Sequence, residues 1–137
     1  ERFIKGRKFE VGVFGYDSPY ASYVGEITDN KNHYNPNDFE AVSGDDLTVP
    51  ADLPNEIQNS IRETAVNAFK ALNCKGFARV DLFITDGGEL LLNKIGVAPG
   101  LRHNSVFPKL MNHLGFSYPY LIDKLLENAI ENAERSY

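Results

Sequence analysis

GFARVDLFITDGGELLLNKIGVAPGLRHNS, residues 76–105, is the stretch that decides the fold. It predicts a β-hairpin with strands over residues 77–85 and 89–95, because the DGG sequence at 86–88 supplies glycines for a tight turn. Two-residue alternation gives the first strand an apolar face and a face that carries charge. The apolar face holds Ala78, Val80, Leu82 and Ile84. The other face holds Phe77, Arg79, Asp81 and Phe83. A purely structural strand does not need that second pattern, so this face is a candidate site.

Two interpretations of Arg79 and Asp81 remain open from the residues alone. The arginine could clamp an anion and the carboxylate could bind Mg²⁺, because hard cations prefer oxygen ligands and the guanidinium fork suits carboxylate or phosphate. The pair could instead be an ion pair on a solvated face. The pattern by itself favours the ion pair.

The bulk composition limits the functional classes. The chain has 137 residues, enough for one domain at 1–137 with a modest core. A net charge of -5 and a pI of about 5.1 argue against a general nucleic-acid surface. The single cysteine, Cys74, fits a reducing and hence cytoplasmic location. No apolar run approaches the roughly 18 residues of a membrane span. The first residue is not methionine, so we expect a piece of a larger protein.

The remaining sequence predicts strands and amphipathic helices. Strands are expected over 8–16, 21–27 and 47–49, and a long polar loop over 28–46. Apolar residues at three- and four-residue spacing predict a helix over 54–73, and serines can cap helices that begin at 105 and 117. The expected fold class is α+β, a largely antiparallel sheet with amphipathic helices on one face. The other face would be left open for a ligand.

Other candidate residues have ordinary explanations. The loop over 99–105 could bind an anion at a helix N-terminus, although an ordinary loop with a serine cap explains it as well. The three histidines, His33, His103 and His113, are too scattered for a metal site. Cys74 is expected to be a small buried residue rather than a nucleophile.

Several segments together resemble a known family. They are residues 4–16, VPADLP at 49–54, LNCKGFARVDLF at 72–83, residues 90–110 and SYPYLIDKL at 117–125. In this order they are similar to the C-terminal ATP-grasp lobe of D-alanine–D-alanine ligases, over essentially the whole chain. The resemblance implies an ATP-dependent carboxylate–amine ligase that joins two D-alanines for peptidoglycan synthesis, through an acyl phosphate. It implies ATP, Mg²⁺ and D-alanine as ligands.

The resemblance also assigns roles to individual positions. It implies that Asp81 is a Mg²⁺ ligand and that Arg79 steadies the transferred phosphoryl group. The N–H of Gly100 would belong to the oxyanion site, and Ser105 with Val106 would contact the second substrate. The positions that would hold the adenine are Glu1, Ile4 and Phe83.

The chain departs from the family pattern at functional positions. Where the family has Asn-Glu-x-Asn after the second strand, this chain has Asn93-Lys94-Ile95-Gly96, so the metal-bridging glutamate is Lys94 and the asparagine ligand is Gly96. A lysine opposes Mg²⁺ and a glycine offers no side-chain oxygen. Lys8 occupies the position of the glutamate that holds the ribose. Glu40-Ala41 replaces the Lys-Tyr pair of the long loop, and Leu101-Arg102 follows Gly100 in place of Phe-Thr.

These departures lead to three functional expectations. The first is a ligase lobe that is inactive as this chain and binds ATP and Mg²⁺ weakly or not at all, since the family's N-terminal domain and first ATP-grasp half are not in this sequence. The second is a non-catalytic scaffold or self-associating module derived from that lobe, naturally or by engineering, that forms a homodimer through a former interdomain surface. The third is a weak nucleotide-binding module. In each, Lys94 is expected close enough to Asp81 to take the place of the metal charge.

Overall fold

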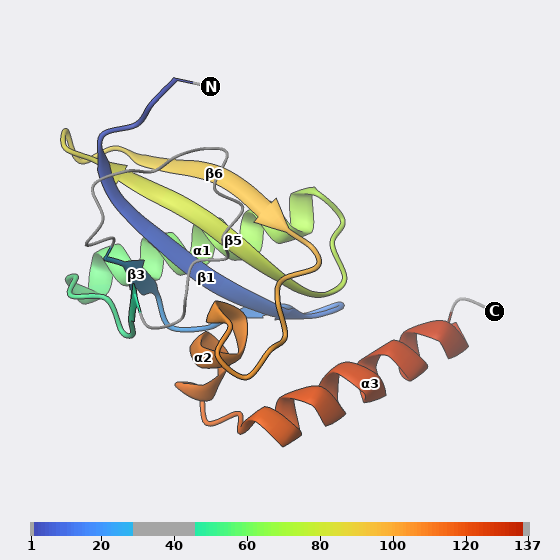
Figure 1. Cartoon of the computed structure of the whole chain (residues 1–137). Helices are drawn as coiled ribbons and strands as arrows, with labels where there is room; N and C mark the ends of the chain where they lie inside the picture. Colours follow the sequence, from blue (N-terminus) through green and yellow to red (C-terminus); the bar gives the residue numbers. More distant parts are fainter. Residues whose placement is uncertain (1, 29–45, 136–137) are drawn as a thin grey trace.

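A computed structural model describes residues 2–28 and 46–135. Its centre is one antiparallel sheet in which β1 (Gly6–Gly15) and β5 (Gly76–Thr85) pair along their full length (Figure 1). The sheet order is β4-β3-β1-β5-β6, with β2 pairing against the end of β1. The remaining strands are β2 (Tyr20–Ala21), β3 (Gly25–Ile27), β4 (Leu47–Thr48) and β6 (Leu90–Gly96).

The segment expected to be one strand over 21–27 is divided into β2 and β3. Side chains explain the division. The Ser22 hydroxyl accepts a hydrogen bond from the Gly12 N–H at 2.9 Å and donates one to the Tyr23 carbonyl at 2.7 Å. The Arg62 guanidinium donates to the carbonyl oxygens of Ala21 and Ser22 at 3.0 and 2.9 Å. These bonds satisfy backbone groups that a continuous ladder would otherwise pair.

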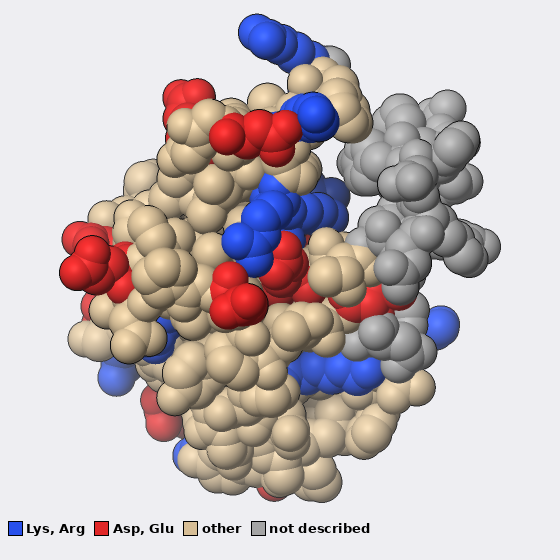
Figure 2. Space-filling view, turned by 90° about the vertical axis from the view of Figure 1, so that its left-hand side faces the viewer, with Lys and Arg blue, Asp and Glu red and all other residues tan. Residues whose placement is uncertain are grey.

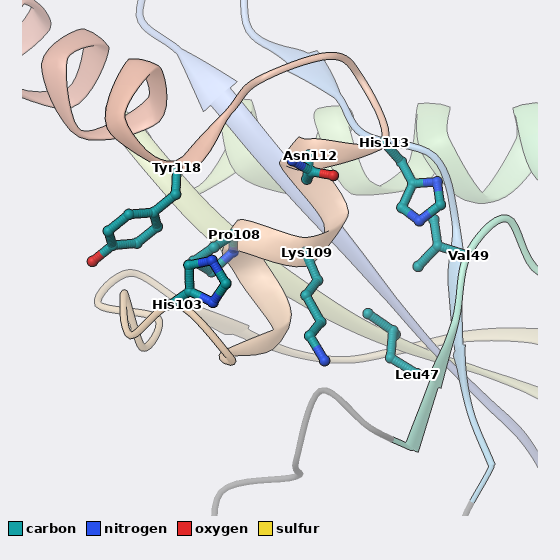
Figure 3. Close-up of a pocket in the computed structure, with 8 residues that line it drawn as sticks. All are labelled: Leu47, Val49, His103, Pro108, Lys109, Asn112, His113 and Tyr118. Atoms are coloured by element: carbon teal, nitrogen blue, oxygen red, sulfur yellow. The ribbon is translucent and has the colours of Figure 1, made fainter.

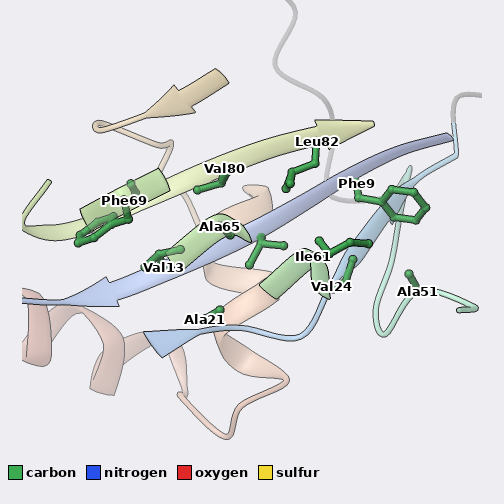
Figure 4. Close-up of a cluster of buried hydrophobic side chains, with 12 residues drawn as sticks. Phe9, Val13, Ala21, Val24, Ala51, Ile61, Ala65, Phe69, Val80 and Leu82 are labelled. Atoms are coloured by element: carbon green, nitrogen blue, oxygen red, sulfur yellow. The ribbon is translucent and has the colours of Figure 1, made fainter. Parts of the chain in front are cut away.

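One face of the sheet is covered by α1 (Asn55–Ala71), close to the helix expected over 54–73. Ile61, Ala65 and Phe69 lie four residues apart and face the sheet, as their spacing predicts. They pack against alternate residues of β1 and β5, together with Ala21, Val24 and Ala51 (Figure 4). The sheet residues of this cluster are Phe9, Val11, Val13, Ala78, Val80 and Leu82.

The opposite face is covered at one end by α2 (Val106–Asn112). The first part of α3 (Tyr118–Arg135) packs beside α2, and the rest of that helix extends past the sheet (Figure 1). Phe107 packs on Phe77 with ring centroids 5.5 Å apart. A Cβ at Gly12 would lie 3.1 Å from the Phe107 ring, so this glycine allows the helix to approach the sheet. Leu121 joins α3 to the same apolar cluster.

The α+β class with an antiparallel sheet is confirmed, but the helices are shared between the two faces. The sequence pattern had placed them on one face and left the other open. One end of the second face is apolar because it carries Phe14 and Phe77. The helices α2 and α3 bury apolar side chains against that end. Among the described residues, no helix combines the length and apolar character that crossing a membrane requires. Among the described residues, α2 and α3 leave the charged end of the second face uncovered.

Candidate functional site

The candidate site is a row of charged side chains on the second face of the sheet, beyond α2. Directly opposed residues of antiparallel strands point to the same face. Glu10 of β1 opposes Asp81 of β5, and Lys94 of β6 opposes the same aspartate. Lys8 opposes Phe83 one step further along. Three neighbouring strands therefore bring two carboxylates and two lysines together.

Arg79 is the group that binds both carboxylates. Its Nε donates a hydrogen bond to Asp81 Oδ1 at 2.9 Å, and its Nη2 donates to Oδ2 at 3.3 Å. The same Nε lies 3.2 Å from Glu10 Oε2. Asp81 and Glu10 are both completely buried, so the guanidinium partly compensates two charges that have lost their water.

The two lysines approach the carboxylates from the sides. Lys8 Nζ lies 3.3 Å from Glu10 Oε1, and Lys94 Nζ lies 3.8 Å from Asp81 Oδ2. The expectation that Lys94 would lie beside Asp81 is confirmed. Figure 2 shows basic and acidic side chains adjoining one another on one face of the molecule, where neither sign forms a broad separate patch.

The position of Lys94 depends on a β-bulge. Near the turn, Ile84 opposes Leu90, Phe83 opposes Leu91 and Leu82 opposes Leu92. Continued regularly, that register would put Asn93 opposite Asp81. The register shifts instead between Asp81 and Leu82, so Asn93 is the extra residue and Lys94 faces the aspartate.

Glu10 belongs to this charged row, but it had not been marked as a candidate site residue from the sequence. Its burial raises its pKa, and the neighbouring charge of Asp81 raises it further, while Arg79 and Lys8 oppose the shift. Among the described residues, neither Glu10 oxygen accepts a well-aligned hydrogen bond despite the nearby cations. For Arg79, burial lowers the pKa, but Glu10 and Asp81 outweigh it and the net pKa is raised. In β1, Glu10 alternates with the core residues Phe9 and Val11 and so lies on the other face of the sheet. This alternation is the feature of the sequence that could have identified it.

The described residues do not fit a Mg²⁺ site. Mg²⁺ needs near-octahedral oxygen ligands. The Asp81 oxygens already accept two hydrogen bonds from Arg79, and Lys94 holds the neighbouring position. Gly96 opposes Arg79 but has no side chain. Within residues 2–28 and 46–135, no group of three or more His, Cys, Asp or Glu side chains could hold a metal ion.

Of the three positions that the resemblance assigns to adenine binding, the structure describes two. Ile4 and Phe83 are half-buried, and Phe83 lies on the charged face opposite Lys8. Glu1 lies outside the described residues, as do Glu40, Ala41 and His33.

Gly100 and Ser105 lie together at the start of α2. A Cβ at Gly100 would lie 3.0 Å from Ser105 Oγ. Ser105 occupies the N-cap position as expected, but its side chain makes no capping hydrogen bond. The side chain of Val106 is buried in the core. The loop that the sequence singled out therefore folds back on the helix that it precedes.

A hollow of about 390 Å³ lies between β4 and α2, and two of the histidines line it from opposite sides (Figure 3). His103 and His113 both line it, with Lys109 between them. The His103 ring meets the Tyr118 ring edge-to-face at 5.5 Å. Cys74 is half-buried beside the core under α1, in agreement with its expected structural role.

The fold is that of a ligase C-terminal lobe. The structure is similar to the D-alanine-D-alanine ligase from Coxiella burnetii, with a TM-score of 0.83 and 34% identity over 99% of this chain. It is also similar to the VanG D-Ala:D-Ser ligase from Enterococcus faecalis, with a TM-score of 0.73 and 30% identity over 93% of this chain. These matches define the class of protein.

The chain belongs to the D-ala D-ala ligase C-terminus family, whose model matches residues 1–127. The D-alanine--D-alanine ligase of Shouchella clausii is 43% identical over 98% of this chain, and that of Halothermothrix orenii is 43% identical over 96%. This chain spans only 37% and 38% of those two relatives, and 35% and 37% of the two solved structures.

Proposed function

We propose that this chain is a ligase-type C-terminal lobe that does not carry out Mg²⁺-dependent ligation of D-alanine. One observation carries the proposal: Lys94 faces Asp81 across the hairpin, with its Nζ 3.8 Å from Oδ2. By the family pattern, that lysine stands where a glutamate would bridge two metal ions. The positive charge that a metal would supply is already present on the protein.

The energetics oppose metal entry. A Mg²⁺ ion at Asp81 would have to displace two hydrogen bonds from Arg79 and lie against the charge of Lys94. Like charges at such distances repel by several kcal/mol at an effective dielectric constant of about 20. Gly96 adds no oxygen ligand to offset that cost. Without the metal, nothing bridges the phosphates to Asp81 as the family's chemistry requires.

The family's substrates are ATP and D-alanine. In this chain, residual nucleotide contacts would come from Glu1, Ile4 and Phe83, and contacts to the second substrate from Gly100, Ser105 and Val106. The buried side chain of Val106 limits it to backbone contacts. Binding of ATP is therefore expected to be weak.

Metal binding tests the proposal directly. Mn²⁺ replaces Mg²⁺ as a paramagnetic probe, and its free fraction is measured by electron paramagnetic resonance. The chain is expected to leave millimolar Mn²⁺ free, whereas Lys94→Glu combined with Gly96→Asn should bind it. Lys75→Glu is the control for charge, because it makes the same charge change at an exposed residue just before β5. Mn²⁺ binding by the unmodified chain at Asp81 would contradict the proposal.

Turnover provides the second test. We expect no ADP release above background from the chain with ATP, Mg²⁺ and D-alanine. A melting temperature unchanged by millimolar ATP and Mg²⁺ would also exclude the weak nucleotide-binding module, because a ligand selective for the native state must stabilise it. Release of ADP that depends on D-alanine would refute the proposed loss of activity.

A second candidate function is self-association through α3. Leu126 and Ile130 lie four residues apart on this helix, and each is 60% exposed. Only Leu121 of the helix is fully buried. Exposed apolar stripes of this kind are typical of interaction surfaces. Sedimentation equilibrium tests it: a homodimer that Ile130→Asp dissociates is expected, and a monomer at high concentration would exclude it.

A further inference from the structure

The charged row contains one more positive than negative side chain. Lys8, Arg79 and Lys94 surround Glu10 and Asp81, and the three cations come from three adjacent strands. In the described part of the chain, no other ion pair involves any of these five residues. The row therefore has a formal charge of +1 when every group is ionised.

The two signs occupy different depths. The Asp81 side chain is 1% exposed and that of Glu10 is 0% exposed. The side chains of Lys94, Arg79 and Lys8 are 59%, 24% and 19% exposed. A ligand that approaches from solvent meets N–H donors, with the carboxylates beneath them.

The ammonium group of Lys94 has N–H donors that no described residue engages in a hydrogen bond. Its Nζ lies 3.8 Å from Asp81, which is beyond hydrogen-bonding distance. Within the described residues it makes no hydrogen bond to any other group. Lysine and arginine both bind phosphate oxygens, lysine as a compact point charge and arginine through its planar fork.

We propose that Lys8, Arg79 and Lys94 form a metal-independent site for a phosphate-type oxyanion. The inference deepens the proposed function, because it rests on Lys94 taking the place of a metal ion. Glu10 and Asp81 hold the arginine in place and balance two of the three charges. A multiply charged polyphosphate gains most, since its several oxygens can contact all three cations. Binding weakens as salt is added, because Lys94 is largely exposed.

The test uses the ¹⁵N-labelled chain in EDTA, titrated with sodium tripolyphosphate and followed by two-dimensional NMR. Saturable shifts are expected for the amides of residues 8–10, 79–81 and 94–96. Parallel titrations with ATP and adenosine, also without metal, distinguish a free polyphosphate from the phosphate tail of a nucleotide. Tighter binding of ATP than of tripolyphosphate assigns the site to a nucleotide, and equal binding assigns it to the anion alone. Adenosine that binds while tripolyphosphate does not would overturn the proposal.

Two variants separate the site from general electrostatics. Lys94→Gln should weaken tripolyphosphate binding by about fivefold, the upper end for one exposed charge pair. Lys75→Gln, with the same change in net charge, should leave the affinity unchanged. Circular dichroism melting checks that each variant is folded. The proposed site would be ruled out if both variants lost the same affinity for tripolyphosphate. It would also be ruled out if the amide resonances of the unmodified chain did not shift at about 10 mM tripolyphosphate.

The oxyanion site can fail its test while the proposed loss of ligase chemistry still holds. A chain that binds neither polyphosphate nor Mn²⁺ loses only the oxyanion site. Polyphosphate binding that requires Mg²⁺ would overturn both, and the Mn²⁺ experiment would then detect the metal.

Discussion

Glu10 and Asp81 lie directly opposite each other on β1 and β5, and both are completely buried. Two ionised carboxylates in this arrangement repel each other and have lost their hydration. Arg79 Nε lies 2.9 Å from one and 3.2 Å from the other. The positive charge of Arg79 therefore offsets the repulsion between the two carboxylates, and we expect the free energy of unfolding to depend on this arginine.

Replacing Asp81 with asparagine should lower the free energy of unfolding. The change removes the charge to which Arg79 donates two hydrogen bonds and leaves the buried guanidinium with Glu10 alone. A loss of about 1–3 kcal/mol is expected, measured by urea denaturation. Asp86→Asn is the control, because Asp86 pairs with Lys5 in solvent, and it should change stability by less than about 0.5 kcal/mol. A stabilised Asp81→Asn variant would contradict the role given to Arg79 and Lys94.

The raised pKa of Glu10 predicts how stability depends on pH. The folded chain holds this proton more tightly than the unfolded chain, whose carboxyl has its ordinary pKa of about 4.5. The contribution of Glu10 is therefore fully present below pH 4.5 and is lost as the pH rises through the raised pKa. Urea denaturation between pH 4 and 8 measures it.

Glu10→Gln supplies the comparison, because glutamine does not titrate. The difference in unfolding free energy between the unmodified chain and Glu10→Gln should shift against the unmodified chain as the pH rises. Glu89→Gln, at an exposed position, should follow the unmodified chain. Parallel curves for the chain and Glu10→Gln would show that Glu10 has no raised pKa.

Truncation of Phe107 tests the packing of α2 on the second face. The ring is buried and contacts Phe77 at 5.5 Å between centroids. Phe107→Ala should cost about 3–5 kcal/mol, as expected for a large buried side chain that leaves a cavity. Phe3→Ala is the matched control at an exposed position, and it should change little. Similar melting temperatures for the two variants would mean that α2 does not pack on the sheet.

Arg62 should be needed for the division between β2 and β3. Its guanidinium binds two successive carbonyl oxygens and lies over the Tyr23 ring at 5.7 Å. Arg62→Lys keeps the charge but cannot make both bonds, so a loss of about 1–2 kcal/mol is expected in thermal or urea unfolding. Arg135→Lys, which alters an exposed ion pair with Asp17, should cost almost nothing. Equal stability of Arg62→Lys and the unmodified chain would remove the role given to the two bonds.

Local patterns were sufficient for most of the fold. The DGG turn and the alternation on either side of it predicted the hairpin of β5 and β6. The four-residue spacing of Ile61, Ala65 and Phe69 predicted the buried side of α1. These features follow from the backbone period of each element, which is written in the order of the residues.

The placement of helices on both faces was not predictable from those patterns. A periodic stripe shows that a helix buries one side, but it does not say against which surface. The apolar surface on which α2 packs is formed by Gly12, Phe14 and Phe77. These residues belong to strands that are distant in sequence from the helix.

The sequence by itself determined that Arg79 and Asp81 share one face. Its resemblance to the family implied that Lys94 and Gly96 stand at positions of the metal site. Only the tertiary structure decided what Asp81 meets. Counting from the turn puts Asn93 opposite Asp81, and the bulge at Asn93 brings in Lys94 instead. The pairing of β1 with β5 then adds Glu10 from 71 positions earlier in the chain. The pairing of β1 with β5 joins segments that are distant in sequence, and the bulge breaks the register that the turn would set for β5 and β6, so neither contact of Asp81 follows from the local pattern.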